Sequence, residues 1–329
     1  MKVCICGGGS LGHVCAGVLS SQQDIRLNIY TGHPGMWQES IEVTDPAGRV
    51  FTATPEKVSS NPSEVVSGQD LIFFCLPGYL LEKTLTDIKP FIGKAVVGTV
   101  VASTGFFFFA HEILGPEASL FGFQRVPFIA RVREYGKSAG LLGYKPELAV
   151  VTENVADKEV FRREMERLFM TPVTLLSNFY EVALTNSNPI LHTGRLYTLF
   201  QGRENQVFDH RILFYKEWTD EASRKLIDMD AEFFLLLKAL GVSSIPSLLE
   251  YYESTDAASL TQKLRSITAF QGIESPMVAV EGGWKADFTS RYFTEDFPFG
   301  LRWIRDLAHE HQIQTPVIDR VYDWGIRCI

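Results

Sequence analysis

The sequence lacks any apolar run long enough to cross a lipid bilayer. Its most hydrophobic stretches, residues 71–76 and 106–110, have the length of a strand or a turn, whereas a spanning helix needs about 20 apolar residues. No secretory signal is expected either, because the glycines at 7–9 interrupt the apolar N-terminus and no cleavage-type segment follows. These absences predict a soluble, cytoplasmic protein.

Cysteine and basic charge are also scarce. The chain has 5 cysteines and no C-x-x-C pair, and Cys4 and Cys6 are spaced as alternating side chains of an apolar run rather than as metal ligands. We therefore expect buried, reduced thiols and no metal site. Lysine and arginine total 31 against 39 aspartates and glutamates, a net charge of −8. This balance argues against a nucleic-acid partner, which requires clustered positive charge.

What the chain does have is length and an alternating pattern in its first half. At 329 residues it exceeds the size at which one hydrophobic core usually keeps growing, so two domains are expected. Short apolar runs alternate with helix-like segments, and we expect strands at 2–6, 26–30, 70–76 and 95–101 and helices at 11–20 and 79–92. Such alternation predicts an α/β domain of Rossmann type, with a doubly wound, mostly parallel sheet, over residues 1–176.

The pattern changes towards the end of this domain and again after it. Residues 119–152 contain glycine-punctuated apolar segments, which we expect to be extended strands that close the first domain, and 157–169 should be its last helix. Helical periodicity then dominates, at 179–200, 222–240, 259–270, 300–311 and 317–324. No strand alternation recurs, so residues 177–329 are predicted to form an all-α domain.

The segment Gly7-Gly8-Gly9-Ser10-Leu11-Gly12 fits the pattern G-x-G-x-x-G. Gly7 permits a tight strand-to-helix turn, Gly9 lets a pyrophosphate approach bare backbone, and Gly12 lets the helix lie close to the strand. The amides at Ser10 and Leu11 would open the helix, whose positive end faces the phosphates. The motif therefore predicts a dinucleotide site, with Leu76 and Pro77, at the end of the run 70–76, as further cofactor-binding candidates.

The choice between NAD and NADP is left open by the end of the second expected strand. An NAD site usually carries an acidic residue there for the ribose 2′-hydroxyl, but this chain has Tyr30-Thr31-Gly32-His33. Thr31 and His33 can hydrogen-bond either a ribose or a 2′-phosphate. NADP is therefore at least as well supported as NAD.

A nicotinamide enzyme that reduces a C=O or C=N bond needs a proton donor, and histidine is the usual one. Of the seven histidines, His192 lies in Asn188-Pro189-Ile190-Leu191-His192. Asn188 is expected to be the N-cap and Pro189 the first helical residue, which places Asn188 and His192 one turn apart on one face. A polar pair at a helix start is a candidate site, although a satisfied core histidine is an equally simple interpretation.

A second unusual segment is residues 287–300, DFTSRYFTEDFPFG, in which five aromatic residues are interleaved with charges. This composition does not make an amphipathic helix. It predicts a partly buried loop whose charges must be paired. Considered alone, the segment could be a structural arginine–aspartate clamp over the last helices.

Taken together, these segments resemble the opine dehydrogenase family, of octopine/nopaline dehydrogenase type. The similarity lies in the glycine-rich start, in the N-x-x-x-H segment 188–192 and, most specifically, in RYFTEDFPFG at 291–300, which is similar to the family's R-Y-x-T-E-D-x-P-x-G. The resemblance implies that an α-keto acid and an amino acid condense to an imine, which NAD(P)H reduces.

The resemblance also implies roles for individual residues. His192 would be the general acid/base and Asp296 would orient its imidazole and stabilise the charged form. Arg291 would bind a substrate carboxylate through its planar fork, and Asn188 would hydrogen-bond the substrate or the nicotinamide amide. Arg195 is either a second carboxylate anchor or a surface pairing residue.

Two alternatives remain at this stage. A keto-group reductase of the 2-dehydropantoate reductase or glycerol-3-phosphate dehydrogenase type would share the architecture but use a lysine, for which Lys285 is best placed in the sequence. A dinucleotide-binding regulatory protein without turnover would need neither histidine nor arginine. A homodimer through the helical half is a further hypothesis.

Overall fold

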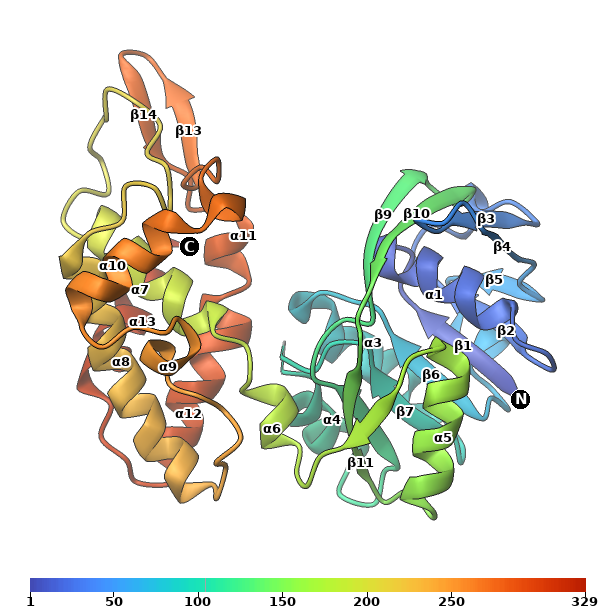
Figure 1. Ribbon diagram of the computed structural model, residues 1–329. Coiled ribbons are helices and arrows are strands. Elements are labelled where there is room, and N and C mark those ends of the chain that lie inside the picture. Colours follow the sequence, from blue (N-terminus) through green and yellow to red (C-terminus); the bar gives the residue numbers. More distant parts are fainter. Residues whose placement is uncertain (104) are drawn as a thin grey trace. The chain divides into compact units, whose positions relative to one another are not determined.

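The chain folds into two compact units. The computed structural model describes residues 1–103 and 105–329 (Figure 1), and packing separates Met1–Ala183 from Leu184–Ile329. The boundary expected from the sequence lay between residues 176 and 177. The stretch between the two positions contains α6 (Tyr180–Ala183), which packs against β11 in the first unit.

The main sheet of the first unit is mostly parallel, as predicted. Its strands lie in the order β12-β11-β8-β7-β6-β1-β2-β5, and the pair β11–β8 is antiparallel while its other neighbouring pairs are parallel. All four residues of β6 are buried, as expected for a strand covered on both faces. The bounds are β1 (Lys2–Cys6), β2 (Arg26–Tyr30), β5 (Lys57–Ser59), β6 (Leu71–Phe74), β7 (Val96–Thr99), β8 (Leu120–Phe123), β11 (Leu148–Glu153) and β12 (Val173–Leu175).

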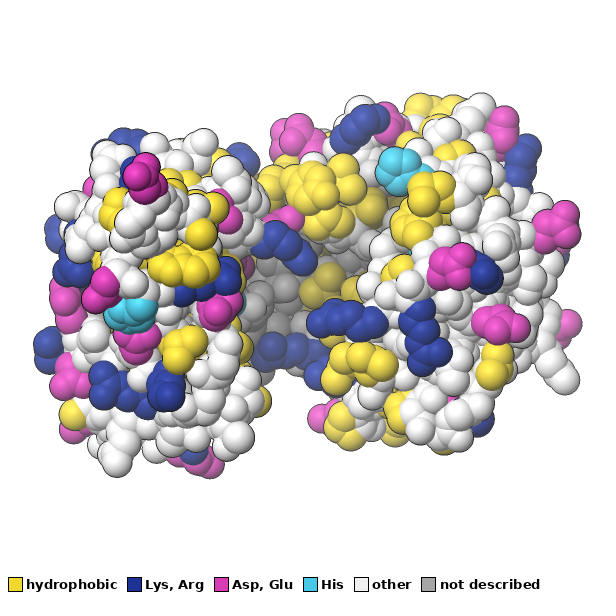
Figure 2. Space-filling view, turned by 90° about the horizontal axis from the view of Figure 1, so that it is seen from above, with side chains coloured by type: hydrophobic (Ala, Val, Ile, Leu, Met, Phe, Trp, Pro, Cys, Tyr) yellow, Lys and Arg dark blue, Asp and Glu magenta, His cyan; other side chains and the backbone are white. Residues whose placement is uncertain are grey.

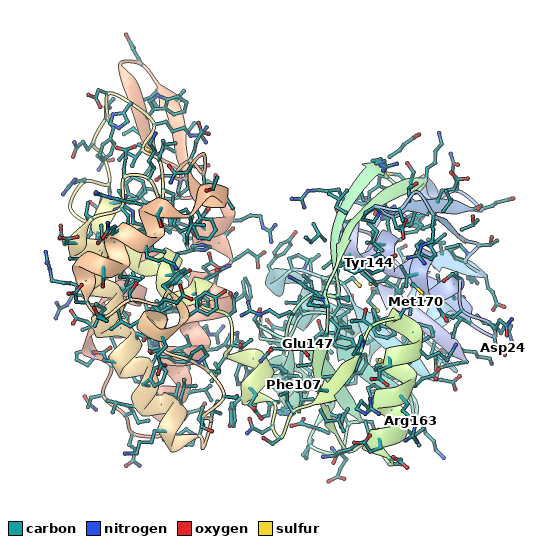
Figure 3. All side chains as sticks on the ribbon, viewed as in Figure 1. Asp24, Phe107, Tyr144, Glu147, Arg163 and Met170 are labelled. Carbon is teal, nitrogen blue, oxygen red and sulfur yellow. The ribbon has the colours of Figure 1, made fainter. Side chains whose placement is uncertain are left out.

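Helices cover this sheet, and one of the expected helices is broken. The segment 79–92 forms η2, α3 and η3 instead of one helix, because Pro90 lacks the N–H that an α-helix would need there. In α5 the Asp157 side chain caps the first turn, and the helix ends at Met170 with a φ of 52° (Figure 3). The helices are α1 (Ser10–Ser20), η1 (Pro34–Met36), α2 (Pro62–Val65), η2 (Gly78–Leu80), α3 (Leu81–Ile88), η3 (Lys89–Phe91), α4 (Phe106–Leu114), α5 (Lys158–Phe169) and α6.

A second, smaller sheet was not predicted. It has the order β4-β3-β10-β9, from β3 (Ile41–Thr44), β4 (Val50–Ala53), β9 (Phe128–Glu134) and β10 (Ser138–Tyr144). The expectation that all strands within 119–152 close the main domain is thus corrected: β8 and β11 join the main sheet, whereas β9 and β10 leave it. Burial alternates at the start of β9, which packs on α1, so this sheet is covered on one face. Tyr144, labelled in Figure 3, donates to Asp45 at 3.0 Å and ties β10 to the end of β3.

Phenylalanine fills much of the first unit's core. Phe73 meets Phe121 and Phe169 edge to face, with ring centroids 5.1 and 5.6 Å apart. Phe107 of α4 (Figure 3) occupies the space left by the missing side chain of Gly122, where a Cβ would lie 2.6 Å from the ring. These contacts fasten the helices to the sheet that presents the glycine-rich turn.

The second unit is predominantly helical, as predicted, but it includes a hairpin that was not. The hairpin pairs β13 (Met277–Val280) with β14 (Gly283–Ala286) through a turn at Gly282, whose φ is 84°. The expected helix at 179–200 is interrupted, since α7 starts at Asn188 with Pro189 in its first turn. The helices are α7 (Asn188–Phe200), α8 (Asp220–Ala239), α9 (Leu248–Tyr251), α10 (Ala257–Ser266), η4 (Thr268–Phe270), α11 (Arg291–Thr294), the π-helical η5 (Phe297–Leu301), α12 (Arg302–Glu310) and α13 (Pro316–Cys328).

Charges of both signs are distributed over the surface. Acidic and basic side chains are interspersed over each unit on the face seen in Figure 2. Among the described residues, no helix is long and apolar enough to span a membrane. The same residues contain no group of three or more histidines, cysteines or acidic residues that could hold a metal ion.

Candidate active site

The glycine-rich turn lies between β1 and α1, where the geometry explains three of its glycines. Gly7 has a φ of 125°, and a Cβ there would lie 2.5 Å from the Cys75 carbonyl oxygen. A side chain on Gly12 would overlap the Gly7 carbonyl. Gly9, in contrast, has no atom within 4 Å of an added Cβ, so its backbone faces open space. Two glycines therefore close the turn and the third leaves it accessible, as a pyrophosphate requires.

Gly8 is a third constrained glycine, which the motif pattern does not single out. A Cβ at this position would lie 2.7 Å from the Thr31 hydroxyl and would overlap the Tyr135 hydroxyl. The run of three consecutive glycines is a signal in the sequence, but its cause is Tyr135, which lies more than a hundred residues away.

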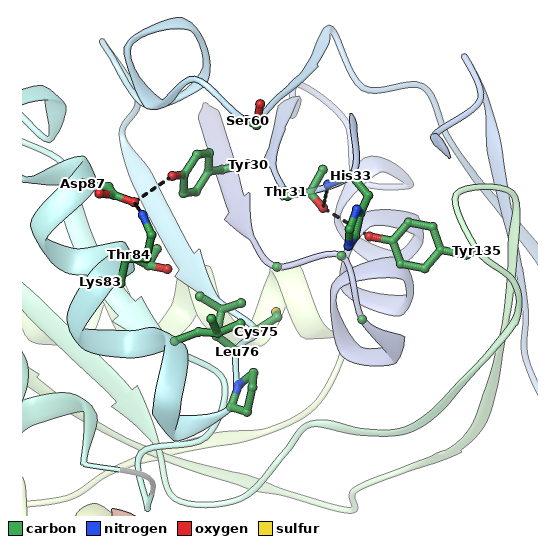
Figure 4. Close-up of a pocket in the computed structure, with 16 residues that line it drawn as sticks. Tyr30, Thr31, His33, Ser60, Cys75, Leu76, Lys83, Thr84, Asp87 and Tyr135 are labelled. Carbon is green, nitrogen blue, oxygen red and sulfur yellow. Dashed lines mark hydrogen bonds and ion pairs between the residues drawn. The ribbon is translucent and has the colours of Figure 1, made fainter. Parts of the chain in front are cut away.

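A cavity of about 600 Å³ opens beside this turn (Figure 4). The predicted residues Gly7, Gly9, Thr31, His33, Leu76 and Pro77 line it. Ser10 and Leu11 do not: the Ser10 hydroxyl accepts from the Val132 amide at 3.1 Å, and Leu11 packs on the core. Both still contribute backbone to the first turn of α1, which has no side-chain cap in the described part of the chain.

A carboxylate that the sequence did not reveal also lines this cavity. Asp87 of α3 accepts from the Tyr30 hydroxyl at 3.2 Å and from Lys83 at 2.5 Å (Figure 4). Burial and the nearby Asp87 raise the pKa of Tyr30 to about 12, so its hydroxyl stays protonated. Asp87 is not apparent from the sequence around the end of β2, because it comes from a helix more than fifty residues further on.

In the second unit the structure brings His192 and Asp296 together. His192 lies on α7, and Asp296 directly precedes η5, which packs on the same helix. A Cβ on Gly300 would lie 2.7 Å from Pro189, so the glycine permits this close approach. The His192 Nδ1 and Asp296 Oδ2 atoms are 2.8 Å apart, and the side chains are 12% and 19% exposed. A carboxylate can only accept, so the proton of this hydrogen bond lies on Nδ1.

The second ring nitrogen of His192 has a partner that the sequence did not suggest. The Tyr215 hydroxyl lies 3.3 Å from Nε2, and the Tyr292 ring is tilted against the imidazole with centroids 4.7 Å apart. Burial raises the pKa of Tyr215, which therefore remains a neutral hydrogen-bond donor. Because Nδ1 donates to Asp296, Nε2 of the neutral ring accepts a hydrogen bond from the Tyr215 hydroxyl.

The remaining predicted site residues have different settings. Asn188 is exposed and is the first residue of α7; Ser187, not Asn188, is the N-cap, which corrects the helix start. Arg291 is exposed at the start of α11, and the described residues give its guanidinium no ion pair or hydrogen bond. Its neighbour Tyr292 touches His192.

Arg195 requires a correction, because it is neither a surface residue nor available to a substrate. Its side chain is 1% exposed and donates to the backbone carbonyls of Phe214 and Glu217 at 3.2 and 2.7 Å. Burial lowers its pKa to about 10, which leaves it charged near neutral pH. Arg195 instead fixes the loop that carries Tyr215, and Trp218 stacks on its guanidinium at 5.2 Å.

Comparisons with known proteins match this description. Residues 175–327 match the family described as NAD/NADP octopine/nopaline dehydrogenase, alpha-helical domain. The tauropine dehydrogenase of Arabella iricolor is 27% identical over 98% of this chain and 89% of its own length.

Solved structures share the fold over almost the whole length of the chain. Octopine dehydrogenase with NADH and L-arginine aligns with a TM-score of 0.87 at 22% identity, covering 99% of this chain and 89% of that one. Yersinopine dehydrogenase with bound NADP+ aligns with a TM-score of 0.78 at 13% identity, covering 100% and 90%.

The fold is that of a two-domain protein, with a Rossmann-type α/β unit followed by a helical unit. More specifically, the helical unit matches the NAD/NADP octopine/nopaline dehydrogenase family over residues 175–327, and the whole chain is similar to opine dehydrogenases.

Proposed function

We propose that this chain catalyses the reductive condensation of an α-keto acid with an amino acid, to give an N-(carboxyalkyl)amino acid. The observation that carries the proposal is the 2.8 Å contact between His192 and Asp296, in a unit that matches the helical domain of octopine/nopaline dehydrogenases. A C=N bond is the acceptor in this reaction, which makes the enzyme a dehydrogenase of the CH–NH class.

The cofactor fits the residues of the first unit. The open backbone at Gly9, the uncapped start of α1 and the adjoining cavity suit a pyrophosphate and an adenosine. The bound nicotinamide supplies the hydride. Thr31, His33, Leu76 and Pro77 would line the adenosine half, and Tyr30, Lys83 and Asp87 extend the same wall.

The proton chemistry falls to His192. The amine adds to the keto carbon, and the resulting hydroxyl must be protonated before it can leave as water and form the imine. The imidazolium form of His192 donates this proton from Nε2, and Asp296 holds Nδ1–H and stabilises the positive charge. This loss of water leaves a protonated (iminium) nitrogen, so a hydride supplied by a bound nicotinamide would give the neutral secondary amine. For this donation the Tyr215 hydroxyl must give up its place at Nε2 or receive the proton and pass its own onward.

Arg291 is proposed to bind a carboxylate of the substrates. Both the keto acid and the amino acid carry one, and the exposed guanidinium has no partner of its own among the described residues. Asn188, exposed at the start of α7, is proposed as a hydrogen-bond donor to the substrate or the nicotinamide amide.

The test is a matrix of NADH and NADPH oxidation with pyruvate, oxaloacetate and 2-oxoglutarate, each with and without every amino acid. We expect oxidation that requires both a keto acid and an amino acid, and His192→Asn should lower kcat about a hundredfold or more. His309→Asn is the matched control, because His309 also contacts an aspartate, Asp319 at 2.9 Å, but is 49% exposed.

Other outcomes would favour the alternatives. Oxidation that proceeds with a keto acid alone, survives His192→Asn and is lost in Lys285→Ala would favour the keto-group reductase. Dinucleotide binding with no turnover in any combination would favour a regulatory role.

The cellular setting is proposed on separate grounds. All 5 cysteines are free and four of them are buried, which fits a reducing compartment such as the cytoplasm. A homodimer through the helical half stays a prediction.

A further inference from the structure

A fully buried histidine joins the glycine-rich turn to the small sheet. His13 of α1 is 0% exposed. Its Nδ1 lies 2.9 Å from the Gly9 carbonyl oxygen, and its Nε2 lies 2.8 Å from the amide nitrogen of Gly136, in the turn between β9 and β10. The second contact joins His13 to a residue 123 positions further along the chain. Neither contact was foreseen from the sequence, in which His13 only follows the glycine motif.

The two backbone partners define the state of this imidazole. The Gly136 amide can only donate, so Nε2 must carry a lone pair, and the Gly9 carbonyl can only accept, so Nδ1 must carry the proton. His13 is therefore neutral and in a single tautomer. Burial, its largest influence, lowers the pKa of His13, in agreement with the geometry. Trp37 stacks on the ring with centroids 4.3 Å apart, and Tyr135 meets it edge-on at 5.2 Å.

The turn that His13 holds is itself a wall of the dinucleotide cavity. Tyr135, next to Gly136, lines this cavity and places its hydroxyl 3.2 Å from the Thr31 hydroxyl (Figure 4). The same hydroxyl fills the space above Gly8. The backbone of Gly136 has a φ of 70°, and a Cβ there would overlap the Met36 carbonyl. The turn is thus seated between η1 and the glycine-rich turn, with the His13 imidazole as the hydrogen-bonded link.

We propose that His13 is a positioning residue for the dinucleotide, which holds the β9–β10 turn and its Tyr135 against the glycine-rich turn and so shapes the cofactor cavity. The proposal rests on the cofactor part of the proposed function and is independent of His192 and of the substrates. Protonation of His13 would place an N–H at Nε2, facing the N–H of Gly136, and would break the hydrogen bond between them. At acid pH the β9–β10 turn should therefore move away from the cofactor cavity.

Few other titratable groups face this imidazole. On the turn the titratable neighbour is Tyr135, and the flanking Glu134 and Lys137 are exposed and paired with each other at 2.9 Å. On the η1 side the ring contact is the uncharged Trp37, but His33, the N-cap of η1, meets the Tyr135 ring with centroids 6.2 Å apart and lines the same cavity. On α1 itself the next titratable residue is the buried Cys15. The pKa of His13 is set by burial and by the backbone of Gly9 and Gly8. His13→Gln retains His33, so an acid-dependent change that is lost in this variant can be assigned to His13.

The experiment compares two substitutions at His13 by calorimetric titration with NAD+ and NADP+. At pH 8, His13→Leu should weaken binding about tenfold or more, because the buried Gly136 amide loses its acceptor. His13→Gln should restore most of the affinity, since its amide can donate to Gly9 and accept from Gly136. His111→Gln is the control: it makes the same replacement in the first unit at a histidine whose partner is Glu153, and it should bind as the unmodified chain does.

The pH dependence separates a positioning role from a merely structural one. Between pH 8 and pH 5 the affinity of the unmodified chain should fall as the pH drops through the lowered pKa of His13, whereas His13→Gln should be flatter because it has no group to protonate there. Fluorescence of the unliganded protein gives a second readout. Trp37 is the only tryptophan before residue 218, and charging the stacked imidazole should quench it in the unmodified chain but not in His13→Gln.

A third variant guards against loss of folding. Gly136→Ala moves the turn without touching His13 or the glycine motif and should lower affinity similarly, with circular dichroism verifying the fold of each variant. Unchanged affinity in His13→Leu, or an equal acid response in His13→Gln, overturns the inference alone. An unmodified chain that binds neither dinucleotide overturns it together with the cofactor assignment.

Discussion

His13 and His192 show how the same side chain is held by different partners in the two units. Both have contacts at both ring nitrogens, but the partners of His13 are two backbone groups, whereas those of His192 are a carboxylate and a phenol. Backbone dipoles of opposite direction fix a neutral imidazole in one tautomer. A carboxylate instead stabilises the charged ring, and partial exposure leaves a path for a proton. The partners, more than the residue type, decide whether a histidine holds a structure or transfers protons.

Contact with a carboxylate does not by itself mark a proton-transfer histidine. His111 lies 2.6 Å from Glu153, and His210, which is 58% exposed, lies 3.0 Å from Glu217. Solvent screens such pairs, so they stabilise little. The His192 pair differs in its shielding and in the second contact with Tyr215. These two features make it the candidate for chemistry.

The largest expected effect comes from a substitution that blocks the proposed dinucleotide site in the first unit. Gly9→Glu should abolish dinucleotide binding, because the new side chain fills the open approach to the backbone and adds a negative charge where a pyrophosphate must lie. The fold should persist, since nothing lies within 4 Å of a Cβ at this position. Calorimetric titration with NADH measures the loss, and thermal unfolding verifies the fold. Binding of unchanged strength would mean that the turn does not hold the cofactor.

The complementary change disables the second unit alone. Asp296→Asn should lower kcat by a factor of about 10² to 10⁴, because an amide cannot stabilise the imidazolium and favours the wrong tautomer of His192. Dinucleotide affinity should stay as in the unmodified chain, since binding depends on the first unit. Steady-state kinetics and calorimetry give the two quantities. A loss of affinity with intact kcat would contradict the division of tasks.

Sequence patterns predicted the parts of the molecule that depend on local order. The strand, glycine turn and helix at residues 2–20 follow from spacing, because neighbouring residues carry the whole geometry. The parallel sheet also follows, because its buried strands are continuous apolar runs. The small sheet was missed because β3 pairs with β10, almost a hundred residues away, and neither strand has a distinctive pattern.

The site shows the same limit. His192 and Asp296 were paired only through the family resemblance, since no local pattern relates positions 104 residues apart. Arg195 was misjudged because a buried arginine bound to backbone carbonyls is indistinguishable in sequence from a surface one. Asp87, Tyr135 and Tyr215 were missed because each reaches its partner across the fold. Local sequence encodes elements, whereas packing determines which side chains share a site.

The smallest expected effect tests whether the second contact of His192 matters. Tyr215→Phe removes the hydroxyl at 3.3 Å from Nε2 but keeps the ring, which stacks on Phe270 with centroids 4.3 Å apart, so the fold should not change. We expect kcat to fall about tenfold, the size of one net hydrogen bond in a partly buried site, with dinucleotide affinity unaltered.

Two controls sharpen that measurement. Tyr322→Phe removes a hydroxyl from a partly buried tyrosine of the same unit, on α13 beside Arg305, and should leave kcat unchanged. A combined Tyr215→Phe and Asp296→Asn variant distinguishes partnership from independence: if the hydroxyl acts only through an imidazole already held by Asp296, the two losses will not add. Fully additive losses, or a kcat in Tyr215→Phe equal to that of the unmodified enzyme, would reduce the site to a histidine–aspartate pair whose second nitrogen has no functional partner in the protein.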